Sequence, residues 1–196
     1  LRFIFELIQN VDDCDFNSLD DCKLDMKFEF EDGKIILSYN EKGFTPFNIF
    51  AITGIAEAAK NISAQKNEIG EKGIGFKSVF GVANKVLIRS GWFSFELSRD
   101  NFTIPNAAYN DKSYCSGTEM TLFVTFEKSI EIYNQLKSQY CSKDAVFSKN
   151  PILFLNKLTE LKMYFDCFRS MRFCVTRSFR DHKDEFSKES DVIISV

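Results

Sequence analysis

Hydrophobic residues recur with the period of a helix at the start of the chain. Between residues 1 and 15 the apolar positions fall on one broad arc of a helical projection: Phe3, Ile4, Leu7, Ile8, Val11 and Cys14. Glu6, Asn10 and Asp13 are four and three residues apart, so they align as a narrow polar stripe beside that arc. We expect an amphipathic helix that places this stripe at the border of the core.

The pattern changes from helical period to alternation between Leu24 and Tyr39. Apolar residues there alternate with charged ones and Asp32-Gly33 supplies a turn, which together predict a β-hairpin. Further strands are expected over residues 86–89, 92–97, 119–126, 163–165, 172–179 and 192–196, with a charged turn over 180–189. Further helices are expected over 47–60 and 129–140, and another can start at Phe76.

This mixture of strands and helices is typical of an α+β fold, here a two-layer α/β sandwich with a mostly antiparallel mixed sheet and helices on one face. A chain of 196 residues can bury roughly 70% of its unfolded surface. We therefore expect one domain over residues 1–150, with 151–196 as its end or as the start of a following β-rich segment. Because Leu1 is not Met and already lies in a helical pattern, the sequence reads as a piece of a longer protein.

Composition removes several classes of function. The chain has 25 Lys and Arg against 28 Asp and Glu, a net charge of −3, whereas dedicated nucleic-acid binders are usually basic. The single histidine, His182, excludes a site of several histidines, and no apolar run approaches the ~20 residues that span a bilayer. The six cysteines lack metal-ligand spacing. We expect a soluble intracellular protein, cytoplasmic or nuclear, with reduced thiols and neither nucleic acid nor membrane as a partner.

The polar stripe of the first helix has two interpretations. Three polar residues on a helix usually form a solvated face. Alternatively, the amide oxygen of Asn10 could ligate Mg²⁺, and the carboxylate of Glu6, one turn away, could orient or deprotonate a water molecule. The stripe therefore makes a metal–phosphate site a hypothesis.

A glycine-rich segment over residues 70–75 also suggests phosphate chemistry. Three glycines ahead of a helix start let backbone N–H groups close around a phosphate. The segment is not a Walker A loop, because Phe76 stands between Gly75 and Lys77, and it lacks the third glycine of a dinucleotide fingerprint, because Ser78 takes that place. A purely structural turn stays open as the alternative.

Four segments, in order along the chain, resemble the ATP-binding domain of the GHKL group, which has the Bergerat fold and includes DNA gyrase B subunits, ninety-kilodalton heat-shock chaperones, histidine kinases and MutL proteins. Residues 6–13 are similar to its N box, 40–44 stand at its first glycine box, 70–75 are similar to its second, and 117–122 are similar to its late Gly-Thr strand motif. The amino-acid sequences of residues 7–13 and 69–80 are similar to those of the sacsin and plant NO VEIN-type branch. The resemblance covers about residues 1–126, and beyond them it rests on residues 151–155.

The resemblance implies roles for individual residues. Glu6 would be the general base that activates the attacking water, Asn10 would hold Mg²⁺, and Asp13 would be a polar group at the pocket wall. The segment 60–68 would belong to a lid that closes over the nucleotide. The implied phosphate-wrapping residues are Gly70, Lys72, Gly73 and Gly75, with Phe76 behind them.

The adenine end of the implied pocket includes Asn40, Gly43 and Thr118. Asn40 stands where the family has an Asp that accepts a hydrogen bond from the adenine amino group, and an Asn oxygen accepts such a bond without charge assistance. The expected cofactors are ATP and Mg²⁺. The expected function is ATP binding with slow hydrolysis coupled to lid closure in a larger chaperone-like or regulatory protein.

The alternative is a non-hydrolysing nucleotide sensor or protein-interaction module on the same fold. The expected partners are downstream domains of the same chain, a client protein and, on ATP binding, a second copy of the chain.

Overall fold

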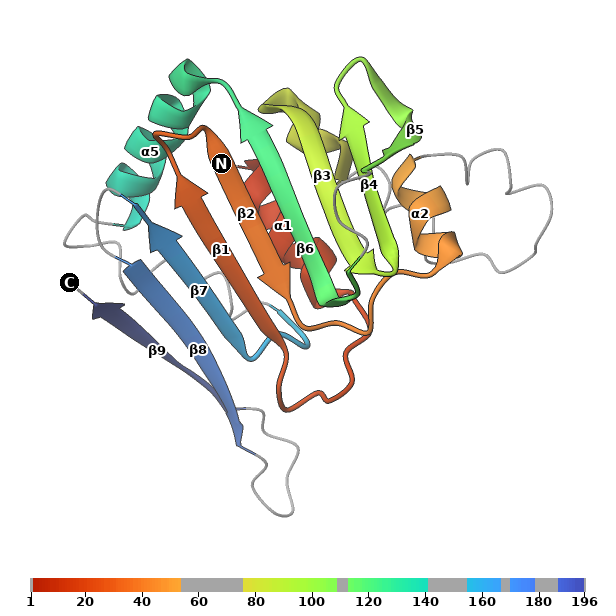
Figure 1. The fold of residues 1–196 in the computed structure, drawn as a ribbon. Helices are drawn as coiled ribbons and strands as arrows, with labels where there is room; N and C mark the ends of the chain where they lie inside the picture. Colours follow the sequence, from red (N-terminus) through yellow and green to blue (C-terminus); the bar gives the residue numbers. More distant parts are fainter. Residues whose placement is uncertain are drawn as a thin grey trace.

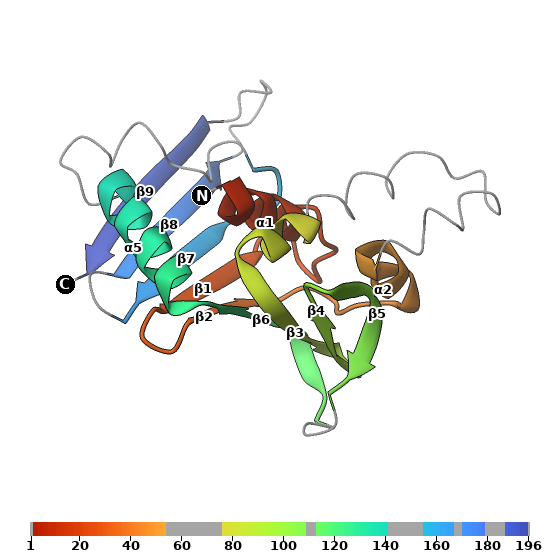
Figure 2. The ribbon, with the colours of Figure 1, turned by 90° about the horizontal axis from the view of Figure 1, so that it is seen from above.

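The computed structural model describes residues 2–53, 76–108, 113–140, 155–166, 170–178 and 187–195. Together these residues form an α+β fold in which helices α1 and α5 lie on one face of an open sheet (Figures 1 and 2). The helical elements are α1 (Arg2–Asp12), α2 (Pro46–Thr53), the 3₁₀ helix η1 (Ser78–Gly81) and α5 (Phe126–Tyr140). The strands are β1 (Lys23–Glu29), β2 (Lys34–Tyr39), β3 (Ala83–Gly91), β4 (Phe93–Ser98), β5 (Asn101–Ala107), β6 (Cys115–Val124), β7 (Glu160–Phe165), β8 (Ser170–Ser178) and β9 (Ser187–Ser195).

The strands follow the order β5-β4-β3-β6-β2-β1-β7-β8-β9 across the sheet. Strand β1 pairs antiparallel with β2, with Met26 opposite Leu37, which confirms the predicted hairpin. On its other edge β1 pairs in parallel with β7, and the remaining described pairs are antiparallel. The division at residue 150 stays a prediction, but β7, β8 and β9 extend the same sheet through β1.

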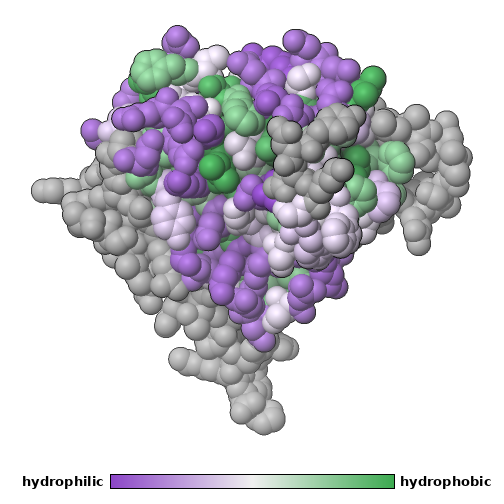
Figure 3. Space-filling model, in the orientation of Figure 1, coloured by the Kyte–Doolittle hydropathy of each residue, from purple (hydrophilic) through white to green (hydrophobic). Residues whose placement is uncertain are grey.

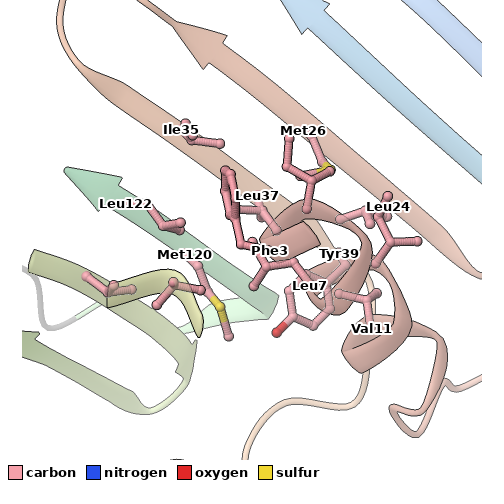
Figure 4. Packing of buried hydrophobic residues seen from close by; sticks show 14 of the residues in the cluster. Phe3, Leu7, Val11, Leu24, Met26, Ile35, Leu37, Tyr39, Met120 and Leu122 are labelled. Carbon is pink, nitrogen blue, oxygen red and sulfur yellow. The ribbon is translucent and has the colours of Figure 1, made fainter. Parts of the chain in front are cut away.

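The core lies between α1 and the central strands, as Figure 4 shows. Side chains from the apolar arc of α1 (Phe3, Leu7 and Val11) point toward those from the inward positions of the hairpin and β6: Leu24, Met26, Ile35, Leu37, Tyr39, Met120 and Leu122. Full burial of one large apolar side chain stabilises a fold by about 1.5–3 kcal/mol. The apolar side chains of α1 therefore pack the helix against the sheet, and this packing sets the position of the polar stripe.

The opposite face of the sheet is largely hydrophilic, as Figure 3 shows for its described part. Cross-strand ion pairs lie there, with Lys85 Nζ 3.1 Å from Glu96 Oε1 and Arg89 Nη1 3.5 Å from Glu119 Oε1. Such exposed pairs contribute little stability individually. The alternation of charged and apolar residues along these strands thus separates a solvated face from the one that carries the helices.

Two expectations about elements were wrong in detail. Strand β5 was not predicted, because its alternation is short and ends at Pro105, a residue tolerated at a sheet edge where its missing N–H needs no partner. Strand β9 begins at Ser187, so the charged residues Lys188 and Glu189 belong to a strand and not to a turn. The helical start expected at Phe76 is confirmed, with Phe76 and Lys77 in helical conformation followed by the four-residue 3₁₀ helix η1.

Candidate functional site

The polar stripe of α1 lines a cavity of about 680 Å³. Cavities that bind small molecules usually have volumes of about 300–1,000 Å³. The structure brings Glu6, Asn10 and Asp13 to this one cavity, with Glu6 and Asn10 half-buried and Asp13 exposed. The other described lining residues come from β2, from the segment after it, from α2 and from three further positions: Leu37, Tyr39, Glu41, Lys42, Gly43, Phe44, Thr45, Asn48, Ala51, Ile52, Phe76, Met120 and Lys157, with Leu7, Gln9, Val11, Cys14 and Asp15 beside the stripe.

Glu6 lies at the beginning of the stripe and is about one quarter exposed. Its Oε1 is 3.3 Å from Nε of Arg2, one helical turn earlier. Because the Arg2 side chain is 91% exposed, solvent screens this pair and it holds the carboxylate only weakly. The Glu6 carboxylate can therefore turn toward a water molecule in the cavity at small cost.

Asn10 lies one turn further along α1. Its backbone carbonyl accepts a hydrogen bond from Cys14 Sγ at 3.2 Å. Within the part of the chain that the structure describes, no hydrogen bond engages its side-chain amide, which lines the cavity. A neutral oxygen is thus available to a ligand or to a hydrated cation.

Asn40 does not have the position that the sequence suggested. Its Oδ1 accepts a hydrogen bond from the N–H of Lys23 at 2.8 Å, and its Nδ2 donates to the carbonyl of Asp21 at 2.6 Å. Asn40 thereby joins the end of β2 to the start of β1, and it is absent from the described lining of the cavity. The adenine contact expected of Asn40 does not fit this geometry.

The next residue, Glu41, does reach the cavity and is only 7% exposed. Its carboxylate accepts a hydrogen bond from Oγ1 of Thr118, which lies beside Oγ of Ser90 in a second hydroxyl contact. Ser90 Oγ accepts the N–H of Phe44 at 2.7 Å. If each hydroxyl donates onward, the buried chain runs from the Phe44 amide to the Glu41 carboxylate, which it fixes in place.

Thr118 was assigned from sequence and Glu41 was missed. Thr118 is 2% exposed, is absent from the described lining of the cavity and donates a hydrogen bond to the lining residue Glu41. One signal in the sequence could have identified Glu41. It is an acidic residue that stands two positions before a glycine, Gly43. Gly43 itself lines the cavity with φ +92°, and a Cβ there would lie 3.4 Å from the amide nitrogen of Gly91. Gly43 therefore permits a turn that other residues would strain.

Tyr39 closes the cavity next to this hydroxyl chain. Burial raises the pKa of its phenol well above the usual value, while a hydrogen bond with Thr118 acts in the opposite direction. Its backbone oxygen packs against Gly117, which has φ +86°. The neutral, buried phenol thus forms an apolar wall beside the Glu41 carboxylate.

Two polar residues cap the N-terminus of α2, which lies beside the cavity. Thr45 Oγ1 accepts the N–H of Asn48 at 3.4 Å, and Oδ1 of Asn48 accepts the N–H of Thr45 at 2.7 Å. This reciprocal pair is a capping box, and Pro46 occupies the first helical position as the sequence predicted. The segment from Glu41 to Asn48 is thereby fixed at both ends.

The remaining predicted phosphate residues lie outside the described part of the chain. These are Gly70, Lys72, Gly73 and Gly75, together with the expected lid over 60–68. Phe76, which follows them, is 3% exposed, lines the cavity and packs edge-on against Phe80 at 6.2 Å between ring centroids. The predicted closing position of Phe76 behind the glycines remains a prediction, although the structure does bring it to the cavity.

The described lining of the cavity is acidic. It has four carboxylates (Glu6, Asp13, Asp15 and Glu41) and two ammonium groups (Lys42 and Lys157). No group of three or more His, Cys, Asp or Glu residues placed to hold a metal ion occurs among the described residues. A cation here would therefore need oxygen atoms from a ligand as well as from the protein, which is how Mg²⁺ is usually held beside phosphates.

Comparison with known proteins gives a partial relationship. No protein-family model matches the chain. Over 95 residues the chain is 38% identical to "Protein NO VEIN" from Arabidopsis thaliana, a match that covers 48% of this chain and 3% of that protein. The chain thus corresponds to a small region of a much longer relative. None of the helices in the described ranges has the length and apolar character needed to cross a membrane.

Proposed function

We propose that this chain is a Bergerat-type domain of the GHKL group that binds ATP with Mg²⁺ in the 680 Å³ cavity and hydrolyses it slowly. One observation carries the proposal: Glu6, Asn10 and Asp13 line the same cavity as a buried carboxylate, Glu41, held by Thr118. These are the residues that the resemblance to the GHKL group assigned to nucleotide chemistry, with Glu41 in place of Asn40. The partial identity with "Protein NO VEIN" agrees with the branch that the sequence resembles.

Glu41 would select adenine. A carboxylate accepts several hydrogen bonds, so it can take one from Thr118 and another from the 6-amino group of adenine. Guanine presents a carbonyl oxygen at the corresponding position, which the carboxylate repels. The buried hydroxyl chain that fixes Glu41 supports preorganised discrimination between these bases.

Asn10 and Glu6 would act at the phosphate end. The amide oxygen of Asn10 fits a hydrated Mg²⁺ that is shared with phosphate oxygens, and the bound ion would neutralise phosphate charge. Glu6, one turn away on the same face of α1, would orient a water molecule and accept its proton. Asp13 would contribute to the polar wall.

A nucleotide sensor without hydrolysis is the second candidate. The Arg2–Glu6 pair favours it, because Oε1 of Glu6 lies 3.3 Å from Nε of Arg2 and would have to leave this contact to act on a water molecule. In both candidates the domain would act within a longer protein of chaperone-like or regulatory type, with neighbouring domains, a client protein or a second copy as partners. Turnover separates the two candidates.

The test is calorimetry with ATP, ADP and GTP, with and without Mg²⁺, followed by turnover measurements. We expect ATP to bind more tightly than GTP and to need Mg²⁺ for full affinity. Asn10→Ala should remove the Mg²⁺ dependence, whereas Asn134→Ala, on the exposed surface of α5, should not. An unchanged affinity of the Asn10→Ala protein for Mg·ATP would count decisively against the metal assignment.

Glu6 is tested by separating binding from chemistry. Glu6→Ala should abolish turnover and keep ATP binding, whereas Glu127→Ala, at an exposed position of α5, should change neither. Equal turnover in wild type and Glu6→Ala would refute the role as base. ATP binding without measurable turnover in the wild type would favour the sensor, and no binding of any nucleotide would overturn both candidates.

A further inference from the structure

The segment 155–159 is attached directly to the end of α1. The carboxylate of Asp12, 3% exposed, accepts three consecutive backbone N–H groups, from Asn156 and Lys157 at 2.7 Å each and from Leu158 at 2.8 Å. A buried carboxylate with three charge-assisted hydrogen bonds holds such a segment firmly. Asp12 was not singled out from the sequence, since its partners lie more than 140 residues away.

Lys157 completes this attachment from the opposite direction. Its ammonium donates to the carbonyl of Cys14 at 2.7 Å and to that of Asp13 at 3.2 Å, just beyond the last residue of α1. These carbonyls lie at the negative end of the helix dipole, where a cation is favoured. We call this arrangement of Asp12, Lys157 and the backbone of residues 156–158 the clasp.

Lys157 also lines the cavity, together with Asn10 and Asp13. An ammonium has three N–H groups, and the described residues supply acceptors for two of them. The third N–H can donate to a ligand without loss of the contacts to α1. The cavity thus includes a cation from the part of the chain after residue 150.

The far end of the segment is fixed to β1. Thr159 Oγ1 accepts the N–H of Cys22 at 3.1 Å and donates to its carbonyl at 3.0 Å. The next residue, Glu160, begins β7, where it pairs in parallel with Lys23 of β1. The clasp is therefore continuous in sequence with β7, the strand that pairs with both β1 and β8.

We propose that Lys157 contacts the occupant of the cavity and that the clasp couples this occupation to β7, with Asp12 as the positioning residue. The occupant's identity as Mg·ATP rests on the proposed function, and the contact would be to an oxygen of its sugar-phosphate. Coupling is reciprocal: an occupant that gains affinity from Lys157 stabilises the clasp to the same extent. Binding should thus slow hydrogen exchange at the clasp amides.

The first experiment needs no ligand and measures backbone hydrogen exchange by mass spectrometry or NMR. Asp12→Asn removes the charge and one acceptor oxygen, so exchange at residues 156–158 should rise about tenfold or more and spread into β7. Asp20→Asn, the same change at an exposed loop position, should leave both regions unchanged. Faster exchange at the clasp with wild-type exchange in β7 would overturn the link to the strand.

The second experiment adds Mg·ATP at saturating concentration to wild type and Lys157→Met. This variant keeps the three bonds to Asp12, so it remains informative if Asp12→Asn fails to fold. In the wild type, ATP should slow exchange at residues 156–158 about threefold or more. Lys157→Met should bind ATP about tenfold more weakly and lose that slowing, whereas Lys137→Met, on the exposed surface of α5, should behave as wild type.

The outcomes separate this inference from the proposed function. Binding heat without slower exchange at the clasp would overturn the coupling and leave ATP binding intact. Wild-type affinity in Lys157→Met would overturn its contact with the ligand. Absence of heat with every nucleotide would overturn the proposed function together with the Lys157 contact, while the ligand-free comparison would still decide the link between clasp and β7.

Discussion

The buried hydroxyl chain predicts that Thr118→Val destabilises the protein. Thr118 is 2% exposed and links Ser90 to the Glu41 carboxylate. Valine matches threonine in shape and in strand propensity, so the substitution removes the hydroxyl group with little change in packing. It removes the hydroxyl contact of Ser90 with Thr118 and the hydrogen bond that Thr118 donates to Glu41.

The magnitude follows from the hydrogen bonds of Thr118 with Glu41 and Ser90. A hydrogen bond to a charged group contributes about 1.5–3 kcal/mol and a neutral one about 0.5–1.5 kcal/mol. Burial of the added methyl group offsets about 0.8 kcal/mol. We therefore expect Thr118→Val to lower the free energy of unfolding by about 1–3.5 kcal/mol.

The assay is urea unfolding followed by circular dichroism and by fluorescence of the single tryptophan. Thr121→Val is the matched control, because Thr121 lies on the same strand with its side chain on the opposite face of the sheet. The control should change the unfolding free energy by less than about 0.5 kcal/mol. Equal stability of the two variants would refute the contribution of the hydroxyl chain.

Two further changes test the surroundings of this chain. Gly117→Ala should cost about 1–3 kcal/mol, because φ is +86° and a Cβ would press on the backbone of Tyr39, whereas Gly81→Ala meets nothing within 4 Å and should be nearly neutral by the same denaturation measurement. The raised pKa of Tyr39 means that its contribution to stability is fully present below the unfolded-state pKa near 10 and declines as pH rises toward the folded-state value. Tyr39→Phe should flatten the loss of stability between about pH 9.5 and 11 in unfolding curves, and a pH dependence identical to wild type would show that the phenol is not buried.

Local sequence patterns predicted the elements whose side chains repeat with a clear period. The apolar arc of α1 and the alternation of the β1–β2 hairpin gave the correct elements, and the stripe of Glu6, Asn10 and Asp13 reached one cavity. Strand β5 alternates over only four residues before Pro105, so its pairing with β4 is what reveals it. Periodicity therefore located the core-facing elements and missed an edge.

The parts of the site that escaped prediction depend on contacts between distant segments. Asn40 and Glu41 are adjacent, and only the direction of each side chain shows that Asn40 bonds to Asp21 while Glu41 meets Thr118. Asp12 likewise has its partners beyond residue 150. Such pairings carry no local signature, because the sequence between them does not constrain which side chain turns inward.

The parallel pairing of β1 with β7 bears on how the chain folds during synthesis. Strand β1 leaves the ribosome well before the partner of its second edge, since Cys22 and Thr159 are 137 residues apart. At about 5–20 residues per second this interval lasts roughly 7–27 s. Throughout it, β1 would present an unpaired backbone edge, the kind of edge that recruits other strands. The newly made chain should therefore depend on protection from aggregation until β7 (Glu160–Phe165) emerges.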